Sequence, residues 1–498
     1  MELSGAYDSI LHDIAGGFSL ILLLLAGIVC IIWDIFENDE PVLPFVGAVA
    51  CAVAIVWEVR NLDADSATVF YGAIRAYGLS SYINITILLS ALATLILSVP
   101  YLKRIGRGYG EVYALILFAT AGAMMLGTAN SLVTVFVGLE TMSLALYILV
   151  GLVRQDEGGI ESALKYFLLG AFSTGFFLYG IALLYGATGT MYLPQMAYGF
   201  MMRGEMALLF WAGMALFLVG FLFKVSAVPF HMWTPDVYQG APTPLTGYMS
   251  TASKTAAFGA LVLVLYYGLA GMNAAEWQVA LAVAAVVTMV LGNLLALVQA
   301  NVKRMLAYSS IAHAGYVLVA LTAGTSQGYA GAVYYLLIYS VMNIGAFGVM
   351  SMIEWDGKEG RVQTIDSLSG IGFRKPLLGV AMGVFMFSLI GFPPFGGFFG
   401  KVAAFTPAIE AGYTWLAIAG VLTSVLSAYY YLRVLYVFWM RSSKQAAPAV
   451  RDQAFPVTVS SAAVLVSCAV VLIVVGFVPL VRDMVMGFFD ASAFATMP

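Results

Sequence analysis

The chain has very little charge for its length. Of its 498 residues only 10% are Asp, Glu, Lys or Arg, whereas 62% are hydrophobic, and the mean hydropathy is +0.95. A soluble domain of this size needs far more charge to cover its surface. The net charge of −4 also provides no basic field that would attract nucleic acid. The composition therefore indicates a protein of the lipid bilayer that has no nucleic-acid partner.

Cysteine and histidine are scarce as well, with three of each. The cysteines are scattered singly through apolar segments and lack the CxxC spacing of iron–sulfur, haem or zinc sites. The histidines have no metal-ligand spacing either. We therefore expect this chain to contain no metal site, no redox centre and no bound cofactor.

Apolar runs of membrane-spanning length are abundant. About fourteen are long enough to cross a bilayer as helices, so we expect an all-α polytopic membrane protein. The expected spans are 14–36, 41–60, 80–101, 111–129, 131–153, 162–187, 206–228, 243–269, 277–299, 303–322, 328–353, 376–411, 414–440 and 457–481. The first follows Glu2, Asp8 and Asp13 and no basic segment, which predicts a membrane helix rather than a cleaved signal peptide.

Lysine and arginine are distributed unevenly between the two sides of this arrangement. The inner loops would hold Lys103, Arg104, Arg107, Arg154, Lys303, Arg304, Lys358, Arg361, Arg374, Lys375, Arg441, Lys444 and Arg451. The outer side would hold only Arg60, Arg75, Arg203 and Arg482. Because cytoplasmic loops are enriched in basic residues, both termini are expected on the outer, periplasmic side.

Four lysines and a glutamate interrupt the apolar runs. They are Glu140, Lys165, Lys224, Lys254 and Lys401. A charged side chain at the bilayer centre costs roughly 2.5–3.5 kcal/mol on insertion scales. Such residues persist where they face a hydrated interior, pair with one another, and move ions or protons. The pattern predicts ion conduction.

Each of these charges also has a structural explanation. Lys165 follows Glu161 by four residues, so an ion pair on one helix face would account for it. Lys224 would bond carbonyls freed by a nearby proline, and Lys254 would make a polar contact between packed helices. His231 and His313 fit core hydrogen bonding and a proton relay equally well. A membrane scaffold locked by buried charges is therefore one alternative function.

Prolines interrupt two of the expected spans. Pro229 follows Lys224 in the seventh span, and Pro393 and Pro394 precede Lys401 in the twelfth. Proline removes a backbone donor and breaks the helical ladder, so each span is expected to form two half-helices. Non-helical backbone at membrane depth is either buried in protein or lines water.

The two breaks lie five helices apart. Since five is odd, helices 4–8 and 9–13 would form two repeats of opposite membrane orientation, with the broken helices 7 and 12 in matching positions. Paired broken helices in inverted repeats indicate a transport site near the bilayer midplane. The expected regions are helices 1–3 (1–110), the first repeat (111–270), the second repeat (271–440), and helix 14 with the tail (441–498).

Long motifs around these residues resemble a known family. They are FLFKVSAVPFHMWTPDVYQGAPTPLTGYMSTASKTAAF at 221–258, GLETMSL at 138–144, VKRMLAYSSIAHAGY at 302–316 and GFPPFGGFFGK at 391–401. They resemble the antiporter-like subunits of respiratory complex I, the proton-pumping NADH:quinone oxidoreductase, over roughly residues 110–440. The DVYQGAPTP segment, Lys401 in the broken twelfth helix, and the lack of a long lateral helix favour the N branch. The M branch and the related Mrp-type cation/proton antiporters are the alternatives.

The resemblance implies a proton relay through Glu140, Lys224, Lys254 and Lys401, with Lys165, His231 and His313 as further candidates. A buried lysine releases its proton more easily, and a nearby carboxylate opposes that release. The Glu140–Lys224 pair would thus hold a proton and, when the carboxylate is drawn away, pass it to Lys254 and then Lys401. A secondary antiporter driven only by ion gradients is the competing transport mechanism.

The resemblance also implies the surroundings of the chain. NADH, FMN, iron–sulfur clusters and quinone would be bound in or between other subunits. The partners would be a neighbouring antiporter-like M subunit and small membrane subunits such as K and J. The location would be the bacterial inner membrane.

Overall fold

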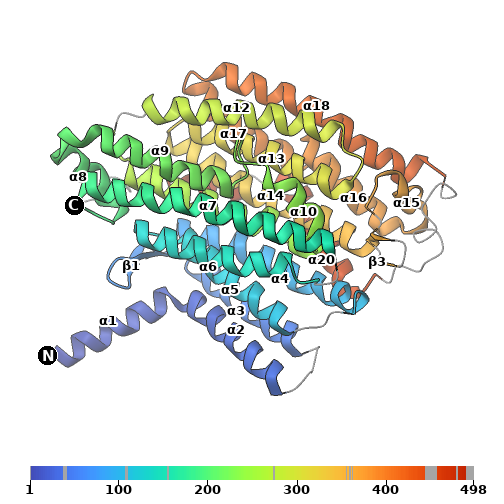
Figure 1. Cartoon of the computed structure of the whole chain (residues 1–498), viewed down its shortest axis with the longest axis horizontal. Coiled ribbons are helices and arrows are strands. Elements are labelled where there is room, and N and C mark those ends of the chain that lie inside the picture. Colours follow the sequence, from blue (N-terminus) through green and yellow to red (C-terminus); the bar gives the residue numbers. More distant parts are fainter. Residues whose placement is uncertain are drawn as a thin grey trace.

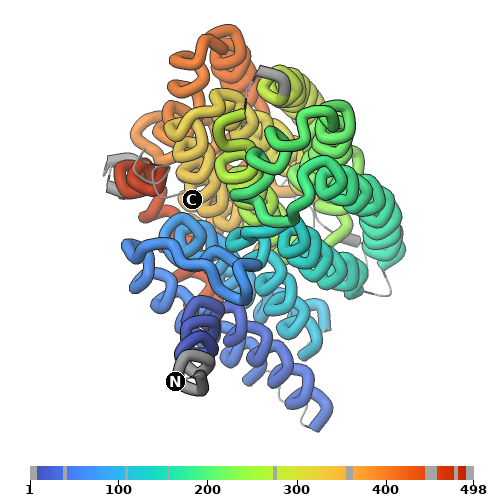
Figure 2. Tube along the Cα trace, turned by 90° about the vertical axis from the view of Figure 1, so that its left-hand side faces the viewer, coloured from blue at the N-terminus to red at the C-terminus, as the bar shows by residue number. Residues whose placement is uncertain are grey.

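The computed structural model describes all residues except 1, 37–41, 107–109, 154–155, 273–274, 355, 358–359, 362, 443–456, 478–479 and 490–498. Long helices lie side by side along one direction (Figure 1) and are seen nearly end-on in Figure 2. The N-terminal helices occupy one side of the bundle in both views. This architecture confirms the predicted all-α polytopic class.

The N-terminal part consists of α1 (Glu2–Gly16), α2 (Phe18–Phe36), α3 (Val42–Arg60), the antiparallel hairpin β1 (Ala67–Val69) and β2 (Ile74–Ala76), and α4 (Leu79–Arg104). The next part consists of α5 (Gly110–Gly127), α6 (Leu132–Val150), α7 (Glu157–Thr188), η1 (Leu193–Gln195), α8 (Met196–Met202), η2 (Gly204–Met206), α9 (Ala207–Lys224), α10 (Trp233–Gly240), α11 (Thr243–Leu263) and the π-helical η3 (Val264–Gly268).

The third part consists of α12 (Ala275–Leu297), α13 (Val302–Thr322), α14 (Ser326–Ile353), the hairpin β3 (Asp356–Gly357) and β4 (Gly360–Arg361), η4 (Asp366–Leu368), α15 (Ile371–Arg374), α16 (Pro376–Ile390), α17 (Gly396–Glu410) and α18 (Thr414–Met440). The C-terminal part has α20 (Val459–Phe477) and α21 (Leu480–Gly487).

Twelve helices of the described chain are each long and apolar enough to cross a membrane, or up to 13 spans if one bent helix pair is counted. The two remaining predicted spans correspond to α16 with α17, which a break separates, and to α20, whose apolar part is shorter. The expectation of about fourteen spans is therefore met when these two are included.

Two features of the N-terminal part were not predicted. The first membrane helix begins at Phe18, not at residue 14, because Gly17 separates it from the distinct helix α1. The Phe70 amide then donates to the Asp13 carboxylate at 2.8 Å, which ties the end of α1 to the β1–β2 hairpin. Strands of three residues are too short to show a periodic pattern in a sequence.

Helices that are consecutive in the chain pack especially closely. A Cβ atom on Gly122 of α5 would lie 2.4 Å from the Met142 backbone nitrogen of α6. A Cβ on Gly180 of α7 would lie 2.5 Å from the Phe217 nitrogen of α9. The α12–α13 pair is equally close, with Gly292 against Ala312. Glycine at these positions permits backbone-to-backbone packing, the usual device of membrane helix pairs.

The centre of the bundle is formed by α11, α13 and α14. Every residue in the apolar stretch of α11 is buried, and so are 94% of that of α13 and 89% of that of α14, against 28% for the peripheral α2. Any polar side chain on these three helices must therefore find its partner inside the protein.

Among the described residues, Lys103, Arg104, Lys303, Arg304 and Arg374 lie at one end of the bundle, which we call the basic end: it is where α4 ends, α13 begins and α15 lies (Figure 1). Arg104 donates to the Met352 carbonyl, and Arg441 pairs with Asp366, so the segments at this end contact one another. Five basic residues that were assigned to inner loops, Arg107, Arg154, Lys358, Lys444 and Arg451, lie outside the described residues.

Candidate functional site: a buried charged axis

Lys224 is the last residue of α9, directly before the first break. Residues 225–232 are not α-helical, and the peptide bond before Pro229 is cis. The Lys224 side chain is buried, and its Nζ donates to Ser143 Oγ at 2.9 Å and to Tyr166 Oη at 3.0 Å. The lysine is therefore held by hydroxyl groups of α6 and α7, whereas the Phe223 carbonyl at the break accepts from the Trp233 indole.

Glu140 lies on α6, one helical turn before Ser143 and hence on the same face. Its Oε1 accepts a hydrogen bond of 2.7 Å from Thr174 of α7, and the residue is half-buried. Lys224 donates to Ser143 and not to Glu140. The predicted pair therefore comes from two helices, Glu140 from α6 and Lys224 from α9, and Ser143 of α6 rather than Glu140 binds the lysine.

Lys254 lies in the middle of the fully buried α11. Its Nζ donates to the Ser310 carbonyl of α13 at 2.7 Å, and the Ser310 hydroxyl accepts from Tyr339 of α14 at 2.7 Å. His313, one turn further along α13, has its ring 5.3 Å from that of Tyr339. A lysine and a histidine therefore lie close together where the three central helices meet.

His313 is bonded on both ring nitrogens. Nδ1 is 2.6 Å from the Tyr335 hydroxyl and Nε2 is 3.1 Å from that of Tyr431, which also bonds Ser309. The imidazole is buried. A histidine between two hydroxyl groups is a suitable proton carrier, since it can accept on one nitrogen and donate from the other.

Lys401 lies in α17, beyond the second break at residues 391–395. Its buried Nζ donates to the carbonyls of Leu389 and Ile390, at 2.9 and 2.7 Å, and to Ser424 Oγ at 2.5 Å. It also lies 5.1 Å from the centre of the Tyr316 ring. The structural explanation given for Lys224, hydrogen bonds to carbonyls freed at a helix break, instead describes Lys401.

Lys165 and His231 lie apart from these contacts. Lys165 is partly exposed near the start of α7 and pairs with Glu161 at 2.6 Å, the expected contact, and also with Asp236 at 2.9 Å. These residues line a cavity of about 470 Å³ at the basic end. His231 lies in the first break, and its buried Nδ1 has no hydrogen-bond partner among the described residues.

Contacts of the described residues link Lys254, His313 and Lys401 into one polar region rich in tyrosine. Asn293 contributes by accepting from Tyr430 at 2.9 Å and donating to Tyr316 at 3.3 Å. Within the described chain, hydrogen bonds do not join Lys224 to Lys254. The tyrosines and serines of this region were not predicted, because such residues are also common in ordinary membrane-helix packing.

No cluster of three or more His, Cys, Asp or Glu that could hold a metal ion occurs among the described residues. The site consists instead of titratable side chains in the protein interior, with helix breaks beside two of them. Fold and site together define a polytopic membrane protein of the ion-translocating kind.

Comparisons with known proteins give the family. Residues 129–427 match the family described as NADH:quinone oxidoreductase/Mrp antiporter, TM. The chain is 60% identical over 502 residues to NADH-quinone oxidoreductase subunit N of Salinibacter ruber, covering 100% of both chains. It is 41% identical over 473 residues to subunit N 1 of Herpetosiphon aurantiacus, covering 93% of this chain and 94% of the relative.

Solved structures show the same fold. A chain of respiratory complex I from Thermus thermophilus with bound aureothin has a TM-score of 0.79 at 34% identity, over 93% of this chain and 98% of that one. A chain of the Mrp complex from Dietzia sp. has a TM-score of 0.83 at 21% identity, over 98% of each chain, and this likeness shows the fold alone. The chain therefore belongs to the subunit N family of NADH-quinone oxidoreductases, as the motifs predicted.

Proposed function

We propose that this chain translocates protons as an antiporter-like subunit of a membrane-bound NADH-quinone oxidoreductase, along the buried axis of Glu140, Lys224, Lys254, His313 and Lys401. One observation carries the proposal: three fully or nearly buried lysines and a histidine sit inside membrane-spanning helices, each bonded to hydroxyl or carbonyl groups. Burying these charges is costly, and a scaffold would not need them.

Glu140 and Lys224 form the switch of this relay. Glu140 is held by Thr174. Ser143, which lies on the same face of α6 as Glu140, accepts a hydrogen bond from Lys224 of α9. A small movement of α6 against α9, which carries Lys224, changes the distance between carboxylate and ammonium, and therefore changes how readily Lys224 releases its proton. The proton then crosses to Lys254 through water, because protein hydrogen bonds of the described residues do not span that gap.

Beyond Lys254 the path continues through His313 and its tyrosine partners to Lys401. Lys401 follows the second break, and Glu410 at the end of α17 lies nine residues further on, about 13–14 Å away at 1.5 Å per residue. Lys401 is thus the last station before release at the end of the bundle opposite the basic end. Lys165 and His231 take part near the first break, at the entry side.

Membership of the subunit N family supports a proposal for the surrounding assembly. Electron transfer from NADH to quinone, with FMN and iron–sulfur clusters, takes place in other subunits, and a neighbouring M subunit and small subunits such as K and J flank this chain. The basic end faces the cytoplasm, so the protein lies in the bacterial inner membrane with both termini in the periplasm. Helices α5–α11 and α12–α18 are the two inverted repeats, in the regions 111–270 and 271–440.

The test uses the tagged chain in its native membrane. Purification in mild detergent should recover NADH-quinone oxidoreductase subunits, and inverted vesicles should take up protons when NADH is added. A sodium or potassium gradient alone should drive no proton uptake. Cation-driven uptake that persists without NADH would instead establish the Mrp-type exchange mechanism and overturn the proposal.

A further inference from the structure

A buried ion pair lies outside the axis, at the basic end. Lys303 at the start of α13 and Glu354 at the end of α14 have their Nζ and Oε1 atoms 3.5 Å apart, and their side chains are 0% and 2% exposed. In the sequence, Lys303 is one of the basic residues expected in the inner loops, and Glu354 has no feature that distinguishes it. A pair removed from water to this degree costs desolvation energy, so its function needs a specific explanation.

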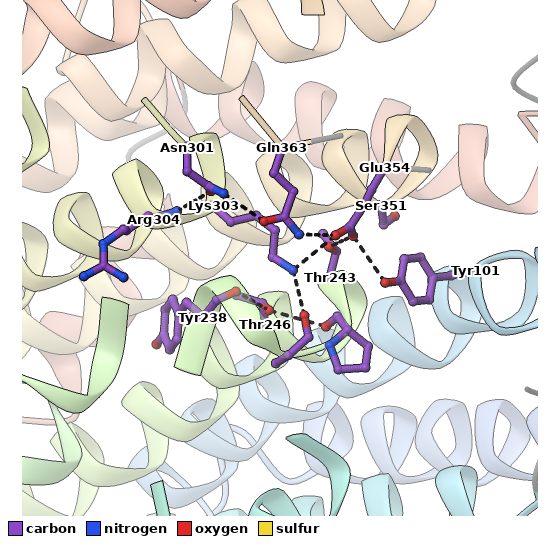
Figure 3. Close-up of polar contacts among 12 residues, drawn as sticks. Tyr101, Tyr238, Thr243, Thr246, Asn301, Lys303, Arg304, Ser351, Glu354 and Gln363 are labelled. Atoms are coloured by element: carbon purple, nitrogen blue, oxygen red, sulfur yellow. Dashed lines mark hydrogen bonds and ion pairs between the residues drawn. The ribbon is translucent and has the colours of Figure 1, made fainter. Parts of the chain in front are cut away.

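The pair gathers segments from both halves of the chain (Figure 3). Glu354 accepts hydrogen bonds from Gln363 at 2.5 Å, from Tyr101 of α4 at 3.2 Å, and from Thr243, the first residue of α11. Lys303 donates to the Ala241 carbonyl, between α10 and α11, at 2.7 Å. The pair therefore forms hydrogen bonds with the start of α11, the helix that carries Lys254.

The next residue, Arg304, binds the neighbouring helix α10. Arg304 extends in a different direction from Lys303 (Figure 3) and donates to Asp236 at 2.6 Å and to Gln239 at 3.2 Å, both on α10. Asp236 is also bound by Lys165 of α7. Two consecutive basic residues of the second half thus hold α10 and the α10–α11 junction of the first.

We propose that Lys303 and Glu354 are a positioning pair, which fixes α10 and the start of α11 against the second half so that Lys224 and Lys254 stay in register. The inference rests on the proposed relay for its effect on pumping. Glu354 suits this role because hydrogen bonds from Gln363, Tyr101 and Thr243 hold its carboxylate in one position between the segments that it joins.

The first variant is Glu354→Gln in the whole complex, with Asp366→Asn as the matched control, since Asp366 forms an exposed ion pair with Arg441 at the same end. A cysteine at Gln239, which lines the basic-end cavity, reports on α10. In inverted vesicles its labelling by an impermeant thiol reagent should become about tenfold faster in Glu354→Gln. This factor corresponds to a decrease of about 1.4 kcal/mol in the free energy that keeps α10 in its packed position. Protons pumped per electron should fall while Asp366→Asn changes neither quantity.

The second variant, Lys303→Met with Glu354→Gln, separates positioning from bulk stability. It removes both charges of the pair together, so subunit content should recover toward the parental level. Labelling should stay fast and the proton-to-electron ratio low, because the hydrogen bond from Lys303 to the Ala241 carbonyl is gone. Parental labelling and pumping in the double variant would show a merely structural pair and overturn the proposal.

The labelling measurement keeps this inference distinct from the relay itself. If Glu354→Gln leaves labelling unchanged, the positioning pair is refuted even where relay variants still impair pumping. If labelling accelerates but the proton-to-electron ratio does not change, the pair does not serve the relay and the proposal is equally refuted. Parental chain without the added cysteine gives the background, since two of its three cysteines are buried and the third partly so.

Discussion

Lys401 and Lys224 hold their ammonium groups in different ways. Lys224 is bonded to two hydroxyl groups, which both donate and accept, whereas Lys401 is bonded to two backbone carbonyls and one hydroxyl. Carbonyls accept hydrogen bonds but cannot take the proton. In the proposed relay, a proton leaving Lys401 must therefore pass through Ser424 or water.

Replacing Lys401 by methionine should abolish its relay step without unpacking the helix, because methionine fills a similar apolar volume. We expect proton translocation per NADH to fall strongly in vesicles, with subunit content unchanged on blots. Lys401→Arg should rescue little, since guanidinium hardly releases its proton. The control is Lys103→Met, an exposed lysine at the basic end. A complex with Lys401→Met that pumps at the parental ratio would reduce Lys401 to a structural contact.

Glu140→Gln should preserve the hydrogen bond from Thr174, because the carboxamide oxygen still accepts it. The negative charge that modulates Lys224 is lost, so pumping should fall while NADH oxidation and assembly continue. The measurement is the ratio of protons translocated to NADH oxidised. Glu410→Gln, at the exposed end of α17, serves as the control. An unaltered ratio in Glu140→Gln would contradict the switch.

At this scale the sequence predicted the charged residues but not their partners. Glu140, Lys224, Lys254 and Lys401 stand out because charge is rare in membrane spans. Tyr166, Tyr335 and Tyr431 do not, because tyrosine is common throughout this chain. Glu354 was not predicted for another reason. It directly follows α14, and an acidic residue at a helix end is usually exposed to solvent, whereas the fold buries this one.

At the scale of elements, prolines predicted both helix breaks, since the loss of a backbone donor acts locally. The β1–β2 hairpin and α1 were missed, because their placement depends on long-range contacts such as that of Asp13 with Phe70. The register of one helix against the next also cannot be predicted from hydropathy alone. It depends on which glycines face which backbone.

Gly122→Ala should weaken the α5–α6 contact, because the new Cβ would lie 2.4 Å from the Met142 backbone nitrogen. Overpacking of this kind costs about 1–3 kcal/mol. We expect less subunit in the membrane and a lower thermal midpoint for the purified complex. Gly383→Ala in α16 is the matched control, since a Cβ there meets nothing within 4 Å. Equal stability of the two variants would show that the helices separate easily.

For the whole molecule, the position of the basic end predicts the orientation in the membrane. Cysteine introduced at Ser367 in η4 should react with an impermeant thiol reagent in inverted vesicles and not in intact cells. Cysteine at Met201 of α8, at the opposite end, should show the reverse and serves as the control. Labelling of Ser367→Cys in intact cells would show that the protein has the opposite orientation in the membrane.

The close packing of consecutive helices has a consequence for how the protein is made. The α5–α6, α7–α9 and α12–α13 pairs can each form their closest contact as soon as the second helix has left the ribosome, because nothing later in the chain is needed. The tie at Glu354 differs, since it joins Tyr101, Thr243 and Lys303 only after α14 has been synthesised. A nascent chain stalled before that point carries Lys303 without its carboxylate, which makes biogenesis most vulnerable to quality-control proteolysis between α13 and the end of α14.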